Sequence, residues 1–261
     1  MLSLEREKKI VDLVNKKGIV SVEELMSLSH ISKTTAHRYI STLDARKQIV
    51  KVRGGARSIL PEGSAAFPAY EEEPPLATKD SFSQEEKRRI AQAARSLISP
   101  GDRIMLDSGS TTLELAKILD KDLHGTLITN DLRIAMTLGA HKHLDMLFVG
   151  GMIRKGFYSS YSYFAEAMLN SLVIDKLFFS VDAISPDLSL LNYTLDDINL
   201  KKSCISKAGE AILLCDHSKF SANARFAFEK LDAVSTIIVD SGLSPDIQRQ
   251  LRRLGKQLLI V

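Results

Sequence analysis

The sequence predicts an α/β protein in two parts: a small N-terminal winged helix-turn-helix and a larger domain built on a doubly wound, mostly parallel sheet. Two observations lead to this fold class. Basic residues are concentrated in the first 57 positions, and after residue 100 short apolar runs recur, most of them closed by a polar residue or a glycine. We place the two parts at residues 1–57 and 84–261, with residues 58–83 as a linker.

Composition excludes several classes of protein. The 261 residues are 44% hydrophobic and 26% charged, as in globular proteins with a packed core. The net charge is +3, but residues 1–57 hold 12 basic and six acidic side chains, whereas the rest holds 23 basic and 26 acidic ones. Only the N-terminal part therefore suits a polyanion such as DNA.

Location and cofactors follow from absences in the sequence. No apolar run approaches the roughly 20 residues of a membrane span, so we expect a cytoplasmic protein without a membrane partner. Cys204 and Cys215 are predicted to be ordinary core residues. Because no cysteines or histidines stand at a metal-ligand spacing, neither a metal nor a cofactor is expected.

Three helices are predicted in the N-terminal part. Helical spacing of apolar residues over residues 4–14 predicts the first. Ser21, followed by Glu24 three residues later, is the pattern of a capping box and marks the start of a short second helix. Ser32 then caps a third helix, predicted from Lys33 to Lys47. The second and third helices form a helix-turn-helix, whose second member reads the major groove.

The start of this recognition helix is polar and basic. After it, apolar and basic residues alternate over Ile49–Val52 up to Gly54-Gly55, which predicts a β-wing whose cations flank the duplex backbone. The alternative is a charged three-helix domain that contacts another protein. The predicted DNA-binding residues are Ser32, Lys33, Thr34, Thr35, His37, Arg38, Lys51, Arg53 and Arg57.

Residues 2–57 resemble the DNA-binding domain of the DeoR family of bacterial transcriptional regulators. The resemblance lies in Ser32-Lys33-Thr34-Thr35-Ala36-His37-Arg38-Tyr39 and in Gly54-Gly55-Ala56. Two positions depart from the family pattern, because His37 replaces an arginine and Tyr39 an aspartate. The resemblance implies a winged helix that binds DNA, with an altered choice of DNA sequence.

In the larger part, short apolar runs alternate with mostly helical patterns, which predicts a parallel sheet. The runs cover residues 103–106, 126–129, 146–149, 177–181, 212–215, 236–239 and 258–261. Ligands of such sheets bind at the carboxyl ends of the strands, so the residues that close the runs are predicted to meet in one crevice. These residues are Asp107, Thr129, Asn130, Gly150, Gly151, Asp182 and Asp216.

One loop between a predicted strand and a predicted helix has the composition of a phosphate site. It consists of Asp107, Ser108, Gly109, Ser110, Thr111 and Thr112. Small residues at a helix N-terminus expose backbone N–H groups, and the hydroxyls add donors. Such turns also serve as plain helix caps, so this alternative stays open. Lys201 and Lys219 are candidate cations for the same anion.

Residues 86–219 resemble the sensor domain of the same family, which is related to the fold of ribose-5-phosphate isomerase. The resemblance lies in residues 107–112, Thr129-Asn130, Gly150-Gly151-Met152-Ile153-Arg154 and residues 216–220. It implies that the serine-rich loop cradles a phosphate and that the Thr-Asn pair, the aspartates and Lys201 line a sugar pocket, and it adds Arg154 to the site. Asp131 departs from the family, in which a serine commonly follows the Thr-Asn pair.

We therefore expect a DNA-binding regulator, not an enzyme. It would repress a carbohydrate-utilisation operon and act as a homodimer or homotetramer on an operator of double-stranded DNA, with a phosphorylated sugar as effector. A sugar-phosphate isomerase that uses Asp182, Asp216 and Lys201 as acids and bases would turn over substrate without DNA and would not need the basic N-terminal part. A protein-binding adaptor would show no salt-sensitive affinity for DNA.

Overall fold

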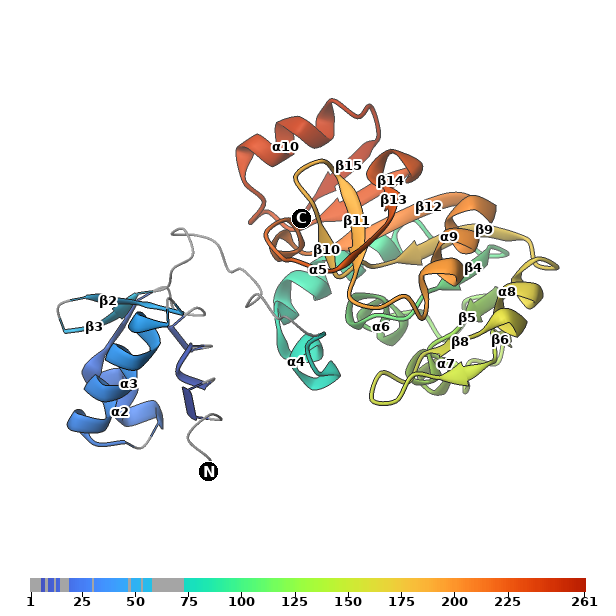
Figure 1. The fold of residues 1–261 in the computed structure, drawn as a ribbon. Coiled ribbons are helices and arrows are strands. Elements are labelled where there is room, and N and C mark those ends of the chain that lie inside the picture. Colours follow the sequence, from blue (N-terminus) through green and yellow to red (C-terminus); the bar gives the residue numbers. More distant parts are fainter. Residues whose placement is uncertain are drawn as a thin grey trace. The chain divides into compact units, whose positions relative to one another are not determined.

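The computed structural model describes residues 6–7, 9–11, 13–14, 19–29, 31–46, 48–52, 54–57 and 73–261, with only the backbone at 19, 28, 29 and 57. The chain divides into two compact units, Met1–Ala69 and Tyr70–Val261, which we call the head and the body (Figure 1).

The described part of the head is a winged helix-turn-helix, as predicted. Its elements are β1 (Ile19–Ser21), α2 (Val22–Ser29), α3 (Lys33–Ala45), β2 (Val50–Val52) and β3 (Gly55–Arg57). The strands form an antiparallel sheet in the order β1-β3-β2. The predicted capping box starts α2: the Glu24 N–H donates to Ser21 Oγ at 3.1 Å, and the Ser21 N–H donates to Glu24 Oε2 at 3.0 Å.

The backbone geometry of the wing explains why glycine stands at both position 54 and position 55. Gly54 takes a φ of +83° in the turn between β2 and β3, a backbone conformation that residues with a Cβ rarely adopt. Gly55 packs so closely on β1 that a Cβ would lie 2.1 Å from the carbonyl oxygen of Val20. The wing can therefore join the three-stranded sheet only with glycine at position 55.

An apolar core holds the head together. Its fully buried members include Leu25 of α2 and Ile40 and Leu43 of α3. Tyr39, which replaces the aspartate common in the family, is only 5% exposed and belongs to this core. The departure at position 39 therefore adds apolar packing to the head, while Arg38 beside it stays exposed.

The body is built on a seven-stranded sheet in the order β15-β14-β12-β9-β4-β5-β6. Every pairing in it is parallel. The strands are β4 (Arg103–Leu106), β5 (Gly125–Thr129), β6 (Leu144–Phe148), β9 (Ile174–Phe179), β12 (Ala208–Cys215), β14 (Thr236–Val239) and β15 (Gln257–Ile260). The predicted α/β class and parallel sheet are confirmed.

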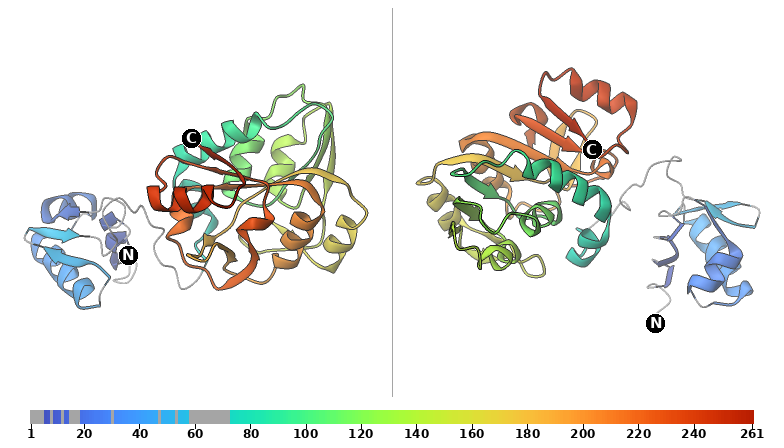
Figure 2. Two further views of the ribbon diagram at one scale, coloured as in Figure 1. Left: turned by 90° about the horizontal axis from the view of Figure 1, so that it is seen from above. Right: turned by 180° about the vertical axis from the view of Figure 1, so that it is seen from behind.

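Helices cover both faces of this sheet (Figure 2). The larger ones are α5 (Gln84–Arg95), α6 (Ser110–Lys117), α7 (Leu132–Leu138), α8 (Tyr163–Leu169), α9 (Ile198–Lys207) and α10 (Pro245–Arg252). The first three share one apolar core with Ile104 and Leu106 of β4, and the last three share the other core with Met105. Successive residues of a strand thus enter opposite cores, as the alternation of side chains along a strand requires.

Smaller elements decorate the body. A two-stranded sheet joins β7 (Met152–Ile153) and β8 (Ser160–Tyr161), and a three-stranded sheet joins β10 (Ala183–Ile184), β11 (Ser189–Asn192) and β13 (Phe226–Lys230). A 3₁₀ turn, η1 (His217–Phe220), follows β12, and another, η2 (Leu231–Ala233), follows β13. No helix in the described part of the chain has both the length and the apolar character that a membrane crossing needs.

The structure corrects the C-terminal end of the predicted linker. Within residues 58–83, helix α4 (Leu76–Ser81) is part of the body. Lys87 of α5 holds it there: the buried ammonium group donates to the carbonyl oxygens of Lys79 and of Phe82, the latter at 2.7 Å. The sequence predicted a linker here because the segment contains several prolines and has no sustained periodicity.

Candidate functional site

One face of α3 is polar and exposed. Lys33, Thr34, His37, Arg38 and Ser41 are all exposed, at spacings of one and four residues. The opposite face enters the core of the head. Because residues four apart in a helix lie on one side, these five side chains form a single surface that a major groove can accept.

The wing packs against this surface. The Lys51 ammonium group donates to Ser41 Oγ at 3.1 Å, and the Lys51 N–H donates to Asp44 Oδ1 at 2.8 Å. Ser32 and Thr35 have a structural task, because Ser32 Oγ accepts from the Thr35 N–H at 3.3 Å and lies 2.8 Å from its hydroxyl. Arg53 and the side chain of Arg57, also predicted to bind DNA, lie outside what the structure describes.

In the body, the strand order reverses between β4 and β9. The chain runs from β4 outward to β5 and β6, and then returns to place β9 on the other side of β4. A pocket of about 530 Å³, including its open mouth, lies where these two strands end. Such a reversal opens a crevice, because the connections leave the sheet in opposite directions.

The serine-rich loop forms one side of this pocket. Ser108, Gly109 and Ser110 line it, and α6 begins at Ser110. The Ser108 N–H donates to Asn130 Oδ1 at 3.1 Å, and the Ser108 hydroxyl donates to Asp131 Oδ2 at 3.1 Å. The loop is therefore held from behind by the end of β5 and presents a helix N-terminus to the pocket.

The threonines predicted in this site lie behind the loop. Thr111 and Thr112 are buried, and the Thr112 hydroxyl donates to the carbonyl oxygens of Asp107 (2.7 Å) and Gly109 (2.9 Å). The Thr129 hydroxyl donates to the carbonyl oxygen of Leu106 at 2.7 Å. These hydroxyls fix the backbone, so the hydroxyl residues of this loop that line the pocket are Ser108 and Ser110.

Lys201 lines the pocket and forms a buried ion pair with Asp107. Their side chains are 5% and 2% exposed, and Lys201 also donates to the carbonyl oxygen of Ser180 at 3.3 Å. Burial by itself lowers the pKa of Lys201, but the carboxylates of Asp107 and Asp197 outweigh it and hold that pKa above its usual range. Lys201 is therefore a permanent cation.

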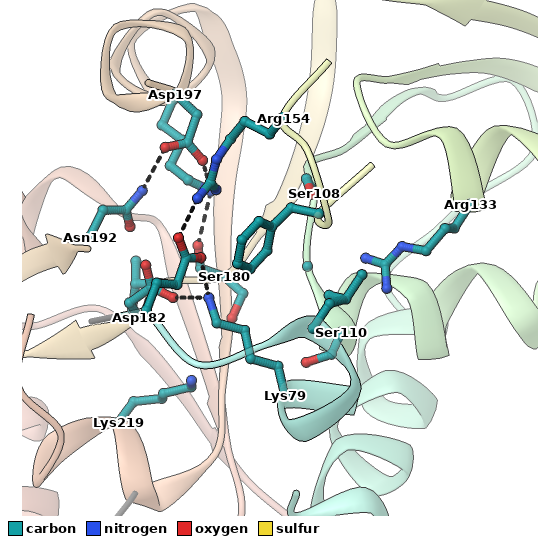
Figure 3. Close-up of a pocket in the computed structure, with 16 residues that line it drawn as sticks. Lys79, Ser108, Ser110, Arg133, Arg154, Ser180, Asp182, Asn192, Asp197 and Lys219 are labelled. Carbon is teal, nitrogen blue, oxygen red and sulfur yellow. Dashed lines mark hydrogen bonds and ion pairs between the residues drawn. The ribbon is translucent and has the colours of Figure 1, made fainter. Parts of the chain in front are cut away.

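A chain of ion pairs closes the pocket on its other side (Figure 3). The Lys79 ammonium group lies 2.6 Å from Asp182 Oδ1 and 2.6 Å from Glu73 Oε1. Arg154 donates to the second oxygen of Glu73, and its guanidinium lies 4.3 Å from the centroid of the Phe157 ring. The predicted residues Asp182 and Arg154 thus meet through two residues of the segment predicted to be a linker.

The unusual Asp131 positions a further cation. It is fully buried at the N-terminus of α7, where it accepts from the Arg133 N–H at 2.8 Å and pairs with the Arg133 guanidinium at 2.7 Å. Arg133 lines the pocket beside Ser110. An aspartate at position 131 therefore supplies both a brace for Ser108 and a support for Arg133.

Of the remaining predicted residues, only Lys219 lines the pocket. Asp216 is buried and accepts from the Ser218 N–H at 3.1 Å, which caps η1. Gly150 and Gly151 follow β6, and a Cβ on Gly151 would lie 2.8 Å from the carbonyl oxygen of Tyr161. Gly151 therefore serves the close packing of β7 on β8.

Sequence reasoning missed about half of the pocket lining. The missed residues are Glu73, Leu76, Lys79, Arg133, Phe157, Ser180, Val181, Asn192 and Asp197. Ser180 and Val181 lie in the run that ends at Asp182, so the end of that strand was a usable signal. The others lie in α4, α7 or β11 or in loops, and their positions depend on how distant segments pack.

His217 offers a pH-dependent contribution to stability. Its Nδ1 lies 2.7 Å from Asp240 Oδ2, and this hydrogen bond raises the pKa of His217 above the ordinary 6.5. The folded state therefore keeps a proton that the unfolded chain releases first. The resulting stabilisation is complete below about pH 6.5 and is lost as the pH rises through the raised pKa.

We expect the His217→Gln variant to lose this pH dependence. Urea unfolding of parent and variant at about pH 6 and about pH 8.5 measures this pH dependence. Between these two pH values, the free energy of unfolding should fall more in the parent than in the variant. Equal losses in the two proteins would contradict the role given to the Asp240 pair.

A winged helix with a polar recognition face, followed by an α/β domain with a cation-rich pocket, defines a DNA-binding regulator that responds to a small molecule. Residues 6–62 match the DeoR-like helix-turn-helix domain, and residues 83–241 match the DeoR C terminal sensor domain. The chain belongs to the DeoR family of transcriptional regulators.

Individual relatives agree with this assignment. A protein provisionally named as a transcriptional regulator of the sgc region in Escherichia coli K12 is 41% identical over 67% of this chain and 66% of its own length. One provisionally named as the aga operon transcriptional repressor of Escherichia coli O157:H7 is 30% identical over 98% and 93%. The HTH-type transcriptional repressor GlcR of Bacillus subtilis is 28% identical over 100% and 97%.

The comparison of folds returned a ribose-5-phosphate isomerase in complex with phospho-erythronic acid, with a TM-score of 0.40 and 20% identity over 52% of this chain and 54% of that one. The relatives that match along the whole chain are regulators. The protein is accordingly a regulator of transcription and not an enzyme.

Proposed function

We propose that this regulator represses a carbohydrate-utilisation operon and that a phosphorylated sugar, bound in the body, changes its affinity for the operator. The composition of the pocket carries the proposal. Exposed N–H groups and hydroxyls at the start of α6 face cationic side chains, a combination that suits a phosphate dianion. The cations are Lys79, Arg133, Arg154, Lys201 and Lys219.

The same pocket offers acceptors for sugar hydroxyls. Asp182, Asn192 and Asp197 line it, and the buried Asn192 Oδ1 has no hydrogen-bond partner among the described residues. A hydroxyl donated to this oxygen would satisfy a buried polar atom, which favours a polyol over a plain anion. The names of the relatives, which include an operon repressor and the repressor GlcR, support repression as the outcome.

The proposed DNA contacts are made by the exposed residues of α3 and by the wing cation Lys51, so the head alone binds the operator. We propose a homodimer or homotetramer in the cytoplasm, because paired heads match repeated half-sites. Effector binding then shifts operator affinity by the coupling free energy, typically about 1–3 kcal/mol. By linkage, operator DNA changes the affinity for the effector equally.

The Ser110→Ala variant tests the effector site. The change removes one hydroxyl from the pocket and none from the head. We therefore expect parent-like operator binding, and release from the operator should need about tenfold more phosphosugar. Gel-shift titration of the upstream DNA against a panel of phosphosugars, at two salt concentrations, measures both. The control is Ser206→Ala, an exposed position on α9.

If Ser110→Ala is released at the same phosphosugar concentration as the parent, the phosphate assignment fails. If no duplex sequence is preferred at moderate salt, the proposed operator binding fails as well.

A further inference from the structure

The Glu73 carboxylate is placed in the pocket as an anionic ligand would be. One oxygen lies 2.6 Å from the Lys79 ammonium group, and the other accepts from the Arg154 guanidinium. Its side chain is only 9% exposed. Each oxygen thus has its own cation, and the two cations come from different segments of the body.

Glu73 differs in its support from the two other acids that line the pocket. Asp182 follows β9 and accepts from the Tyr193 N–H at 3.0 Å, and Asp197 is the N-cap residue of α9. Glu73 precedes α4, separated from it by Pro74 and Pro75. Among these three acids, Glu73 can therefore leave the pocket without disturbing a central strand or a long helix.

The two cations keep their positions without Glu73. Lys79 retains Asp182 Oδ1 at 2.6 Å. Arg154 retains the face of Phe157 and lies 3.5 Å from Asp196 Oδ2. Lys87 holds the end of α4, and with it Lys79. A two-cation site would therefore remain after Glu73 moved away.

We propose that Glu73 competes with the anionic effector for Arg154 and Lys79. This inference rests on the proposed effector site. An arriving phosphate takes over the two cations and repels the Glu73 carboxylate, which favours the conformation with residues 73–75 outside the pocket.

The Glu73→Gln variant tests the competition. Glutamine keeps the shape of the side chain and removes its charge, so the effector no longer displaces an anion. We expect the full-length variant to bind an active phosphosugar about fivefold more tightly, or better, and to leave the operator at a correspondingly lower concentration. Glu73→Ala, which also removes the side chain, is expected to act in the same direction.

Glu85→Gln is the matched control. It removes the same charge from an exposed position of α5, where Glu85 is 71% exposed and pairs with Arg88. Its affinity for the ligand should stay within about twofold of the parent. Calorimetric titration with inorganic phosphate, ribose 5-phosphate, glucose 6-phosphate and gluconate 6-phosphate gives the affinities for all four proteins.

Hydrogen exchange supplies a readout that a merely structural role would not produce. In the parent, a bound phosphosugar should speed exchange in the peptide that contains residues 73–78 while it slows exchange over 108–117. Tighter binding by both Glu73 variants together with this opposite response would support the inference.

Two results would overturn it, and they are distinguishable. If the parent binds a phosphosugar and Glu73→Gln binds it equally or more weakly, Glu73 is not a competitor and the proposed effector site stands. If neither the parent nor Glu85→Gln binds any of the four anions, the proposed effector site itself fails and this inference falls with it.

Discussion

The Arg38→Ala variant is expected to lose operator affinity by about 5- to 150-fold, the effect of removing one bidentate contact to a base. Arg38 is exposed on the polar face of α3, one turn after Thr34, and its neighbours Tyr39 and Ile40 fill the core. The substitution therefore removes the proposed DNA contact and leaves the apolar core of the head intact. Fluorescence anisotropy with the operator duplex at two salt concentrations measures it.

The salt dependence distinguishes the kind of contact that Arg38 makes. A contact to a base edge leaves the slope of log affinity against log salt unchanged, whereas a contact to phosphate lowers its magnitude by about one. Arg88→Ala, which removes a half-exposed arginine from α5 in the body, is the control. If Arg38→Ala binds the operator as tightly as Arg88→Ala does, α3 is not the reading helix.

The Lys201→Met variant is expected to lose about 3–5 kcal/mol of stability, because it leaves the carboxylate of Asp107 buried without its cation. Both side chains are at most 5% exposed, so water cannot replace the lost partner. For a unit of this size the loss corresponds to a fall in melting temperature of roughly 6–20 °C. Differential scanning calorimetry measures it, and the transition of the head serves as an internal reference.

Two further variants separate the ion pair from other effects. Lys202→Met changes the exposed neighbour on the same helix and should melt close to the parent. The double variant Asp107→Asn, Lys201→Met also removes the unpaired negative charge of Asp107, so it should recover part of the lost stability. A Lys201→Met variant that melts with the Lys202→Met control would show that the pair does not stabilise the body.

Local patterns predicted the elements well because local contacts create them. The capping box of Ser21 and Glu24 joins residues three apart, and so does the cap that Ser32 provides for Thr35. The strands of the body follow from short apolar runs, which must be buried on both faces of a parallel sheet. Ser108 and Asp182 stand at the ends of two such runs and line the pocket, and Asp107 pairs with the lining residue Lys201.

The same reasoning assigned the wrong task to hydroxyls and acids that look alike in sequence. Thr112 and Ser110 are two residues apart in one motif, yet the Thr112 hydroxyl is bound to backbone carbonyls and Ser110 lines the pocket. The orientation of α6 against the sheet decides this difference. Likewise, Glu73 belongs to the segment predicted to be a linker, whereas its side chain is only 9% exposed.

By itself, the sequence determined the two-part organisation and the loop at the start of α6, because caps, apolar periodicity and turn glycines act within a few residues of the chain. The family followed from the resemblance of its motifs. Only the tertiary structure decided the charge pairing of the pocket. Glu73 meets Arg154 across 81 residues, and Lys201 meets Asp107 across 94. Such partners are selected by the order of the strands and by the cost of burying an unpaired charge, which no local pattern records.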